Sequence, residues 1–202
     1  MIDAATEVRT LNRSDGLDWS EPREADAALA AMDGPFDLVF DATGALRIGR
    51  DTPEKKLAAI EAEAMARQFA INAIGPALMF KHYERLLPVD RPSVMATLSA
   101  RVGSIGDNGL GGWISYRAAK AALNQIVRTA AIEIARKRPQ AVCAALHPGT
   151  VQTRLSVPVT GANAPGTVTA ETAAENLLSV IAGLGPEQSG GFFAYDGSRI
   201  PW

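Results

Sequence analysis

The chain has 202 residues, 47% of them hydrophobic and 21% charged, with a formal net charge of −2. Its size and composition are typical of one globular domain with a sizeable core. The near-balance of charge excludes the basic surface expected of a nucleic-acid-binding protein. The longest nearly apolar stretch, 70–80, contains Asn72, Gly75 and Pro76, so it is too short and too interrupted to cross a bilayer.

The N-terminus and the single cysteine indicate a cytoplasmic protein. Residues 1–7 contain neither the basic region nor the apolar run of a secretory signal. Cys143 lies in the apolar run 141–146, where a buried core thiol is the simplest interpretation. With one cysteine there is no disulfide framework, and no metal-ligand spacing is present, so no metal site is expected. No membrane partner is expected either, because no stretch of the sequence could cross a bilayer.

Strand-like and helix-like runs alternate along the chain. Strands are expected at 7–12, 36–41, 93–98, 141–146 and 192–195. Helices are expected at 21–32, 51–60, 61–87, 114–138 and 171–184, with an interruption at Gly75 and Pro76. The segments 102–112 and 157–169 are expected to be loops. This order predicts a single α/β domain over 1–202, whose mainly parallel sheet is covered by helices on both faces and binds ligands at the carboxyl ends of its strands.

The pair Tyr116 and Lys120 carries the strongest chemical signal. The two residues are four apart in the 114–138 helix, so they lie on one face, one turn from each other. An ammonium beside a phenol favours the phenolate, and we therefore expect Lys120 to lower the pKa of Tyr116. A phenol of lowered pKa is a general acid or base that works near neutral pH.

Further motifs accompany this pair in a fixed order. They are Asp41-Ala42-Thr43-Gly44, Asn72 before the Gly75-Pro76 break, Gly103, Pro148-Gly149-Thr150 and the closing segment 190–202. With them, residues 36–202 resemble the short-chain dehydrogenase/reductase family, and within it the C-factor-like or sniffer-like carbonyl reductases. The resemblance implies a Rossmann-like, doubly wound fold and NAD(P)(H)-dependent interconversion of carbonyl compounds and alcohols.

The resemblance also implies roles for the matched positions. Tyr116 would exchange the substrate proton, Lys120 would lower the tyrosine pKa and bind the nicotinamide ribose, and Asn72 would hold a bent helix and a water molecule. The implied cofactor-binding positions are Asp41, Ala42, Gly44, Lys120, Pro148, Gly149, Thr150 and Thr153.

Arg13 and Asp18 bear on the choice of cofactor. An arginine at the end of the family's second strand suits a ribose 2′-phosphate, whereas an acidic residue there would bind the 2′-hydroxyl. Arg13 therefore favours NADP(H) over NAD(H). Asp18 resembles the family aspartate beside the adenine ring.

Three departures from the family pattern bear on activity. Ala100 stands where the family has its catalytic serine, and Ser99 and Ser104 are the candidate replacements. Asp41 stands where asparagine is usual, and its carboxylate needs a hydrogen-bond donor. No G-x-x-x-G-x-G precedes Glu7, so the first strand and the glycine-rich loop are not recognisable, and cofactor binding is expected to be impaired.

Two functional hypotheses follow. The first is a reductase for a small neutral carbonyl compound or alcohol, with Tyr116, Lys120, Asn72 and Ser99 as catalytic residues and the uncharged 157–169 loop over the substrate. The alternative is a catalytically silent, reductase-like scaffold that acts through its surface or its oligomer. A homodimer or homotetramer through the 114–138 and 61–87 helices is expected, because small residues along the longer helix allow close approach of a second helix.

Overall fold

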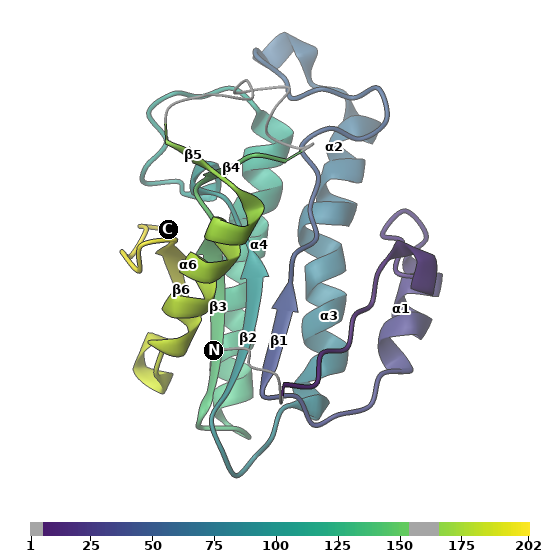
Figure 1. Cartoon of the computed structure of the whole chain (residues 1–202). Helices are drawn as coiled ribbons and strands as arrows, with labels where there is room; N and C mark the ends of the chain where they lie inside the picture. Colours follow the sequence, from purple (N-terminus) through teal and green to yellow (C-terminus); the bar gives the residue numbers. More distant parts are fainter. Residues whose placement is uncertain (1–5, 154–165) are drawn as a thin grey trace.

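A four-stranded parallel sheet organises the chain (Figure 1). The structure, a computed structural model, describes residues 6–153 and 166–202. The sheet has the order β1-β2-β3-β6, with β1 at Leu38–Asp41, β2 at Ser93–Leu98, β3 at Ala141–His147 and β6 at Gly191–Ala194. All three neighbouring pairs run parallel, and Val94 lies beside Val142 in the central pair. The predicted parallel α/β fold is confirmed.

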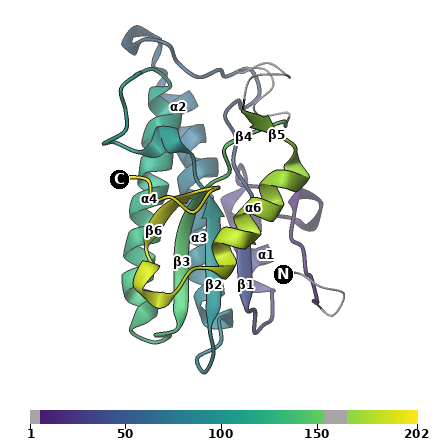
Figure 2. The ribbon, with the colours of Figure 1, turned by 60° about the vertical axis from the view of Figure 1, so that its left-hand side comes forward.

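Helices cover both faces of this sheet, as predicted. α3, at Gly75–Tyr83, and α4, at Ile114–Ala135, lie on one face, and α6, at Ala170–Ala182, lies on the other (Figures 1 and 2). Leu123 and Val127 of α4 are fully buried against the first face. The sequence permits this because apolar residues recur at helical spacing along α4, so that one stripe of the helix meets the sheet. α1, at Pro22–Ala30, packs outside α3 rather than on the sheet.

The helical cover is incomplete over β1, which is an edge strand. Burial alternates along β1, and Phe40 remains 38% exposed on the α6 side of the sheet, whereas β3 and β6 are buried at almost every position. The opposite edge is protected, because the chain turns after β6 and pairs back along it. There the Ile200 N–H donates to the Phe192 carbonyl and the Ala194 N–H to the Ser198 carbonyl.

Two predicted elements are wrong. Residues 7–12 form no strand; the chain is irregular there until a 3₁₀ turn, η1, at Arg13–Asp15. A strand needs a ladder, and no strand among the described residues lies beyond β1 to provide one. Residues 51–60 form no helix beyond a 3₁₀ turn, η2, at Leu57–Ala59, because their side chains are used in contacts with distant elements. Asp51 binds Arg67 over 2.7 Å, and Glu54 reaches the start of α4.

The segment 61–87 is helical in pieces, as expected, but it does not break. α2, at Ala62–Phe69, runs into α3 through a π-helical turn, η3, at Ala70–Ile74, and a 3₁₀ turn, η4, follows at Glu84–Leu86. Pro76 has no N–H to donate to the carbonyl of Asn72, and the wider turn accommodates that missing bond. This turn contains Asn72, where the site is built.

Smaller elements complete the described chain. η5, at Arg101–Gly103, begins the loop after β2, and η6, at Pro186–Gln188, precedes β6. β4, at Thr150–Val151, and β5, at Thr167–Val168, form a separate parallel pair. The predicted loop at 157–169 lies outside the described residues up to position 165. In the described part of the chain no helix is long and apolar enough to cross a membrane.

Candidate active site

The carboxyl end of β1 is closed by the Asp41 side chain. Its carboxylate accepts a hydrogen bond from the Thr43 N–H over 2.9 Å and another from the Thr97 hydroxyl over 2.7 Å. These two bonds supply the donors that a buried carboxylate requires. Asp41 therefore holds the first turn after β1 to the neighbouring strand β2, and Ala42 and Gly44 lie exposed on that turn.

Asn72 fixes the next part of the same turn. Its side-chain carbonyl accepts from the Ala45 N–H over 3.1 Å, and its amide donates to the Ala45 carbonyl over 2.8 Å. Gln68, one helical turn earlier, accepts from the Asn72 amide over 2.7 Å and donates to the Leu46 carbonyl. Both amides are buried, and each has its polar atoms paired. The end of α2 and the π-helical turn thus hold the backbone of residues 45 and 46.

Lys120, on α4, lies next to the same turn after β1. A Cβ on Gly44 would lie 3.2 Å from Asn72 Oδ1 and 3.4 Å from Lys120 Nζ, so Gly44 separates the two side chains with its bare backbone. The Lys120 ammonium donates to the Leu98 carbonyl over 2.8 Å. Gly103 is required nearby, because a Cβ there would come within 2.8 Å of the Lys120 Cβ. The structure therefore brings Asn72, Gly44 and Lys120 together.

Burial dominates the ionisation of Lys120. The side chain is 2% exposed, and this burial lowers its pKa to about 8, while the Asp41 carboxylate opposes the shift. A lysine of this kind exchanges its proton close to neutral pH instead of remaining an ammonium throughout.

Tyr116 behaves differently from the expectation. Burial raises the pKa of its phenol to about 12, so the prediction that Lys120 lowers this pKa is wrong for this structure. Desolvation disfavours the phenolate, and the ammonium that was expected to stabilise it is turned toward Leu98 and Asp41. The hydroxyl of Tyr116 makes no hydrogen bond within the described part of the chain. It remains protonated across neutral pH.

The hydroxyls near Ala100 are engaged elsewhere. Ser99 donates to the Asn124 side-chain oxygen over 2.7 Å, one turn beyond Lys120 on α4. Ser104 donates to the Pro201 carbonyl and accepts from the Asp107 N–H. Ala100 itself is partly exposed in extended backbone. The hydroxyls of Ser99 and Ser104 therefore both make structural hydrogen bonds around the site.

The segment after β3 lies at the same edge of the sheet. The Ser99 N–H donates to the Leu146 carbonyl, which places Pro148, Gly149 and Thr150 next to the end of β2. Gly149 has a φ of +78°, and a Cβ there would lie 3.0 Å from the ring of Tyr195. A glycine is therefore needed both for the turn and for the close approach. Thr153 is exposed at the end of the described part of this segment.

Arg13 and Asp18 lie together, outside the sheet. The Arg13 guanidinium is 3.4 Å from the Asp18 carboxylate, which also accepts hydrogen bonds from Ser20. No contact within the described residues joins either side chain to Tyr116 or Lys120. Trp19 provides the nearest link, because its indole packs on the backbone of Gly75, three residues after Asn72.

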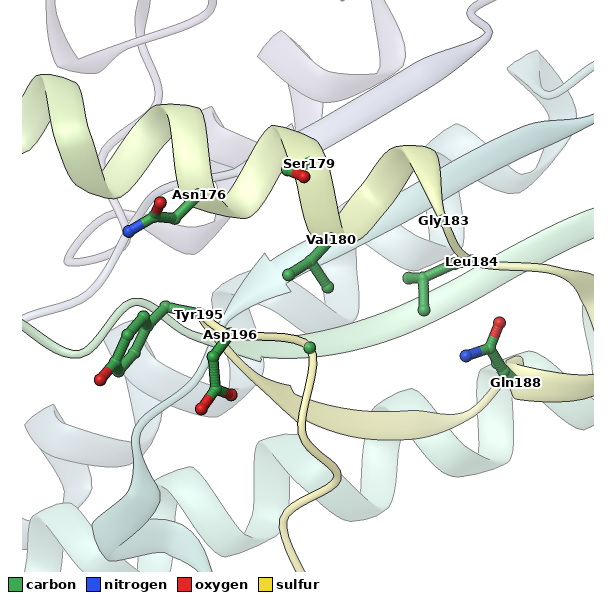
Figure 3. Close-up of a pocket in the computed structure, with 9 residues that line it drawn as sticks. Asn176, Ser179, Val180, Gly183, Leu184, Gln188, Tyr195 and Asp196 are labelled. Atoms are coloured by element: carbon green, nitrogen blue, oxygen red, sulfur yellow. The ribbon is translucent and has the colours of Figure 1, made fainter.

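A surface hollow of about 370 Å³ lies elsewhere, between α6 and the end of β6 (Figure 3). Asn176, Ser179, Gln188 and Asp196 contribute polar groups to its wall, and none of them is a predicted site residue. Tyr195 connects it to the site, because its ring covers Gly149.

Sequence reasoning missed several buried polar residues that shape this site. Gln68 orients Asn72, Thr97 binds Asp41, and Asn124 binds Ser99. Gln68 precedes Asn72 by four residues and Asn124 follows Lys120 by four. A polar residue one turn away on the same buried helical face is a signal that the sequence contained.

Comparison with known proteins gives this arrangement its family. A family model described as enoyl-(acyl carrier protein) reductase matches residues 17–181. The C-signal of Myxococcus xanthus is 36% identical over 173 residues, which are 84% of this chain and 94% of that protein. The chain belongs to the short-chain dehydrogenase/reductase family. The family predicted from the motifs is thereby confirmed.

Of two further likenesses, the first supports an oxidoreductase and the second shows the fold. The 1-hydroxy-2-glutathionyl-2-methyl-3-butene dehydrogenase of a Rhodococcus species is 29% identical over 190 residues, 93% of this chain and 79% of that enzyme. An NADPH-bound carbonyl reductase from chicken fatty liver shares the fold with a TM-score of 0.77 at 24% identity, covering 92% of this chain and 75% of the other. As a family member, this short-chain dehydrogenase/reductase is an NAD(P)-dependent oxidoreductase.

Proposed function

We propose that this protein reduces the carbonyl group of a small, neutral compound to an alcohol with NADP(H), with Tyr116 as the proton donor. The observation that carries the proposal is the meeting of three elements at one edge of the sheet. Tyr116 and Lys120 share one face of α4, and Lys120 faces Asn72 across the backbone of Gly44. Loops at the carboxyl ends of parallel strands are where ligands of this fold bind.

The residues present fit the nicotinamide half of the cofactor. Gly44 leaves open the space that a side chain would fill between Asn72 and Lys120, and the Thr43 hydroxyl is buried without a partner within the described residues. Lys120, Gly44 and the 148–150 segment would hold this half. When bound, the cofactor supplies the hydride. The chicken carbonyl reductase of similar fold binds NADPH, which supports this choice of cofactor, as Arg13 does.

Tyr116 suits the role of a donor better than that of a base. A phenol whose pKa is raised to about 12 carries its proton at every pH where the protein is expected to work. It can therefore donate to the oxygen of a carbonyl as negative charge develops there. Lys120 and Asn72 would fix the turn against which the reacting groups lie.

The pyrophosphate half has weaker support. In complete doubly wound folds, a glycine-rich turn and a helix N-terminus bind the pyrophosphate. No strand with such a turn lies beside β1 in the described residues. We propose that NADPH binds weakly, since no contact within the described residues joins Arg13 or Asp18 to the rest of the site. Calorimetric titration with NADPH tests this, and micromolar affinity would contradict it.

A second candidate function is a non-catalytic one. Ala100 removes the hydroxyl expected beside the tyrosine, and no strand among the described residues pairs with the outer edge of β1. A relative named for a signal is 36% identical to this chain over 173 residues. These observations favour a reductase-like scaffold that acts through its surface.

One experiment separates the two functions. Purified protein is assayed with NADPH and a panel of neutral aldehydes and ketones, and NADPH loss is followed by absorbance. The reductase hypothesis expects turnover that Tyr116→Phe abolishes and that Tyr83→Phe leaves intact, since Tyr83 packs on Phe36 in the core. Absent turnover would favour the scaffold, and turnover that survives in Tyr116→Phe would overturn Tyr116 as the proton donor.

A further inference from the structure

The helix that carries Tyr116 lacks a cap of its own. The residue before α4 is Trp113, whose φ of +52° is the one positive value outside glycine in the described residues. Its indole cannot accept hydrogen bonds from the first turn, and no side-chain cap is formed at this position. The first N–H groups of a helix need acceptors, and Tyr116 is the third residue of this one.

Glu54 provides those acceptors from a distant segment. Its carboxylate accepts from the Ser115 N–H over 3.3 Å and from the Ser115 hydroxyl, and its backbone carbonyl accepts from the Trp113 N–H. One residue therefore holds both sides of the left-handed turn that starts α4. Glu54 and Ser115 are both more than nine-tenths buried.

The charge of Glu54 is accommodated by the helix itself. Glu54 forms no ion pair with any described residue, so its carboxylate depends on the N–H and the hydroxyl of Ser115. The N-terminus of a helix carries partial positive charge, which stabilises an anion placed there. A buried carboxylate is costly unless its charge is matched, so this position binds Glu54 and α4 firmly to each other.

The residue after Tyr116 is held just as firmly. The Arg117 side chain donates to the carbonyls of Gly112 over 2.9 Å, Val102 over 3.1 Å and Gly111 over 3.2 Å. Tyr116 thus lies between two residues that are hydrogen-bonded to other segments. Ser115 is bonded to Glu54, and Arg117 is bonded to the loop after β2. Its own hydroxyl is bonded to neither segment.

We propose that Glu54 is a positioning residue for Tyr116: it caps α4 from outside the helix and sets where the phenol stands. The proposal rests on the proposed function, in which Tyr116 donates the proton. In this role Glu54 acts through Ser115 and the first turn of α4.

Two measurements on one set of variants test the role of Glu54. Glu54→Ala removes all side-chain contacts, Glu54→Gln keeps an acceptor oxygen without the charge, and Ser115→Ala removes only the hydroxyl. Glu61→Ala is the matched control, since Glu61 is an exposed glutamate of the same region whose side chain caps nothing. The first measurement is kcat and KM for the carbonyl substrate. The second is the titration of Tyr116 by NMR of ¹³C-labelled tyrosine, assigned with Tyr116→Phe.

In Glu54→Ala we expect kcat to fall on the order of 10²-fold with KM unchanged, because a small displacement of a reacting group has an effect of that size. The Tyr116 midpoint should move from about 12 toward its ordinary value near 10, while the pKa of Tyr83 stays raised by its burial in the core. Glu54→Gln and Ser115→Ala should show smaller changes in the same direction. Glu61→Ala should show none.

A folded Glu54→Ala with unchanged kcat and unchanged Tyr116 midpoint would overturn the proposal. If Glu54→Ala does not fold, Glu54→Gln decides, and an unmoved midpoint in that variant overturns it. If the unaltered protein reduces no carbonyl compound, the proposed reductase function fails. The Tyr116 midpoint still decides in that case whether Glu54 positions the phenol.

Discussion

The Lys120 ammonium donates to the Leu98 carbonyl from a position that is only 2% exposed. Its pKa of about 8 lies below the ordinary value of 10.5, because burial penalises the charged form. Between these values the unfolded chain binds a proton that the folded chain does not. The contribution of Lys120 to the free energy of unfolding therefore rises as pH increases through this window.

Replacing this lysine should reveal that cost. We expect Lys120→Met to be more stable than the unaltered protein at pH 7, by on the order of 3 kcal/mol, with the difference shrinking as the pH approaches 10.5. Thermal unfolding followed by circular dichroism at several pH values measures it. Lys56→Met, at an exposed position, is the control and should show no such trend. A Lys120→Met difference that does not change with pH would contradict the burial argument.

The raised pKa of Tyr116 predicts that the rates of the two directions of the reaction depend differently on pH. Carbonyl reduction uses the protonated phenol, so its kcat should be level with pH across the neutral range. Alcohol oxidation uses the phenolate, whose population grows about tenfold for each pH unit until the pKa near 12. Initial rates in both directions between neutral pH and pH 10 test this. An oxidation rate that levels off well below pH 10 would show that the phenol ionises more easily than its burial implies.

Much of the fold could be predicted because its signals are local. The apolar runs that became β2 and β3 are continuous, and the helical spacing along α4 is regular, so period and length identify each element. The spacing of Tyr116 and Lys120 fixed their common helical face in the same way. The role of Asn72 followed from the resemblance to the family, and the structure places this residue in the π-helical turn before Pro76.

What could not be predicted depends on contacts between distant segments. Residues 7–12 have the composition of a strand, but a strand exists only where a neighbour offers a ladder. The rise in the Tyr116 pKa follows from burial and from the direction of the Lys120 ammonium, and neither is visible in a four-residue spacing. In the sequence, nothing distinguishes Glu54 from other charged residues of a surface segment. Its role is visible only in the structure, where α4 lacks a cap of its own.

The alanine at position 100 should limit the rate. In the family the equivalent serine provides a donor near the reacting oxygen, and Ser99 and Ser104 donate elsewhere in this structure. We expect Ala100→Ser to raise kcat by about 10²-fold or more, because removing one such donor costs enzymes a factor of this size. Ala59→Ser, on the exposed η2 turn, controls for a general effect of an added hydroxyl. Equal rates for Ala100→Ser and the unaltered protein would show that this position does not face the substrate.

The exposed face of α4 should bury itself in a dimer. Ile132 is 50% exposed there, and Ala118, Ala121 and Ala122 are only partly covered within one chain. Closed two-fold association is the commonest way to cover such a face. Size exclusion with light scattering should give at least twice the chain mass of 21.3 kDa, and Ile132→Glu should reduce it to one chain. Val89→Glu, at another exposed apolar position, should leave the assembly intact, and a monomeric unaltered protein would refute the prediction.

An alanine at position 44 should impair cofactor binding and rate by more than its backbone strain explains. Gly44 and Gly49 both have positive φ, +148° and +60°, so an alanine at either position strains the backbone, by about 1–2 kcal/mol in the left-handed region that Gly49 occupies. Only at Gly44 would the new Cβ meet other side chains, Asn72 and Lys120, whereas nothing lies within 4 Å of Gly49. Gly44→Ala should therefore weaken NADPH binding and lower kcat well beyond the effect of Gly49→Ala. Calorimetry and initial rates measure both effects, and thermal unfolding shows whether the two variants lose similar stability. Equal losses of binding and rate in the two variants would mean that the cofactor does not occupy the space between Asn72 and Lys120.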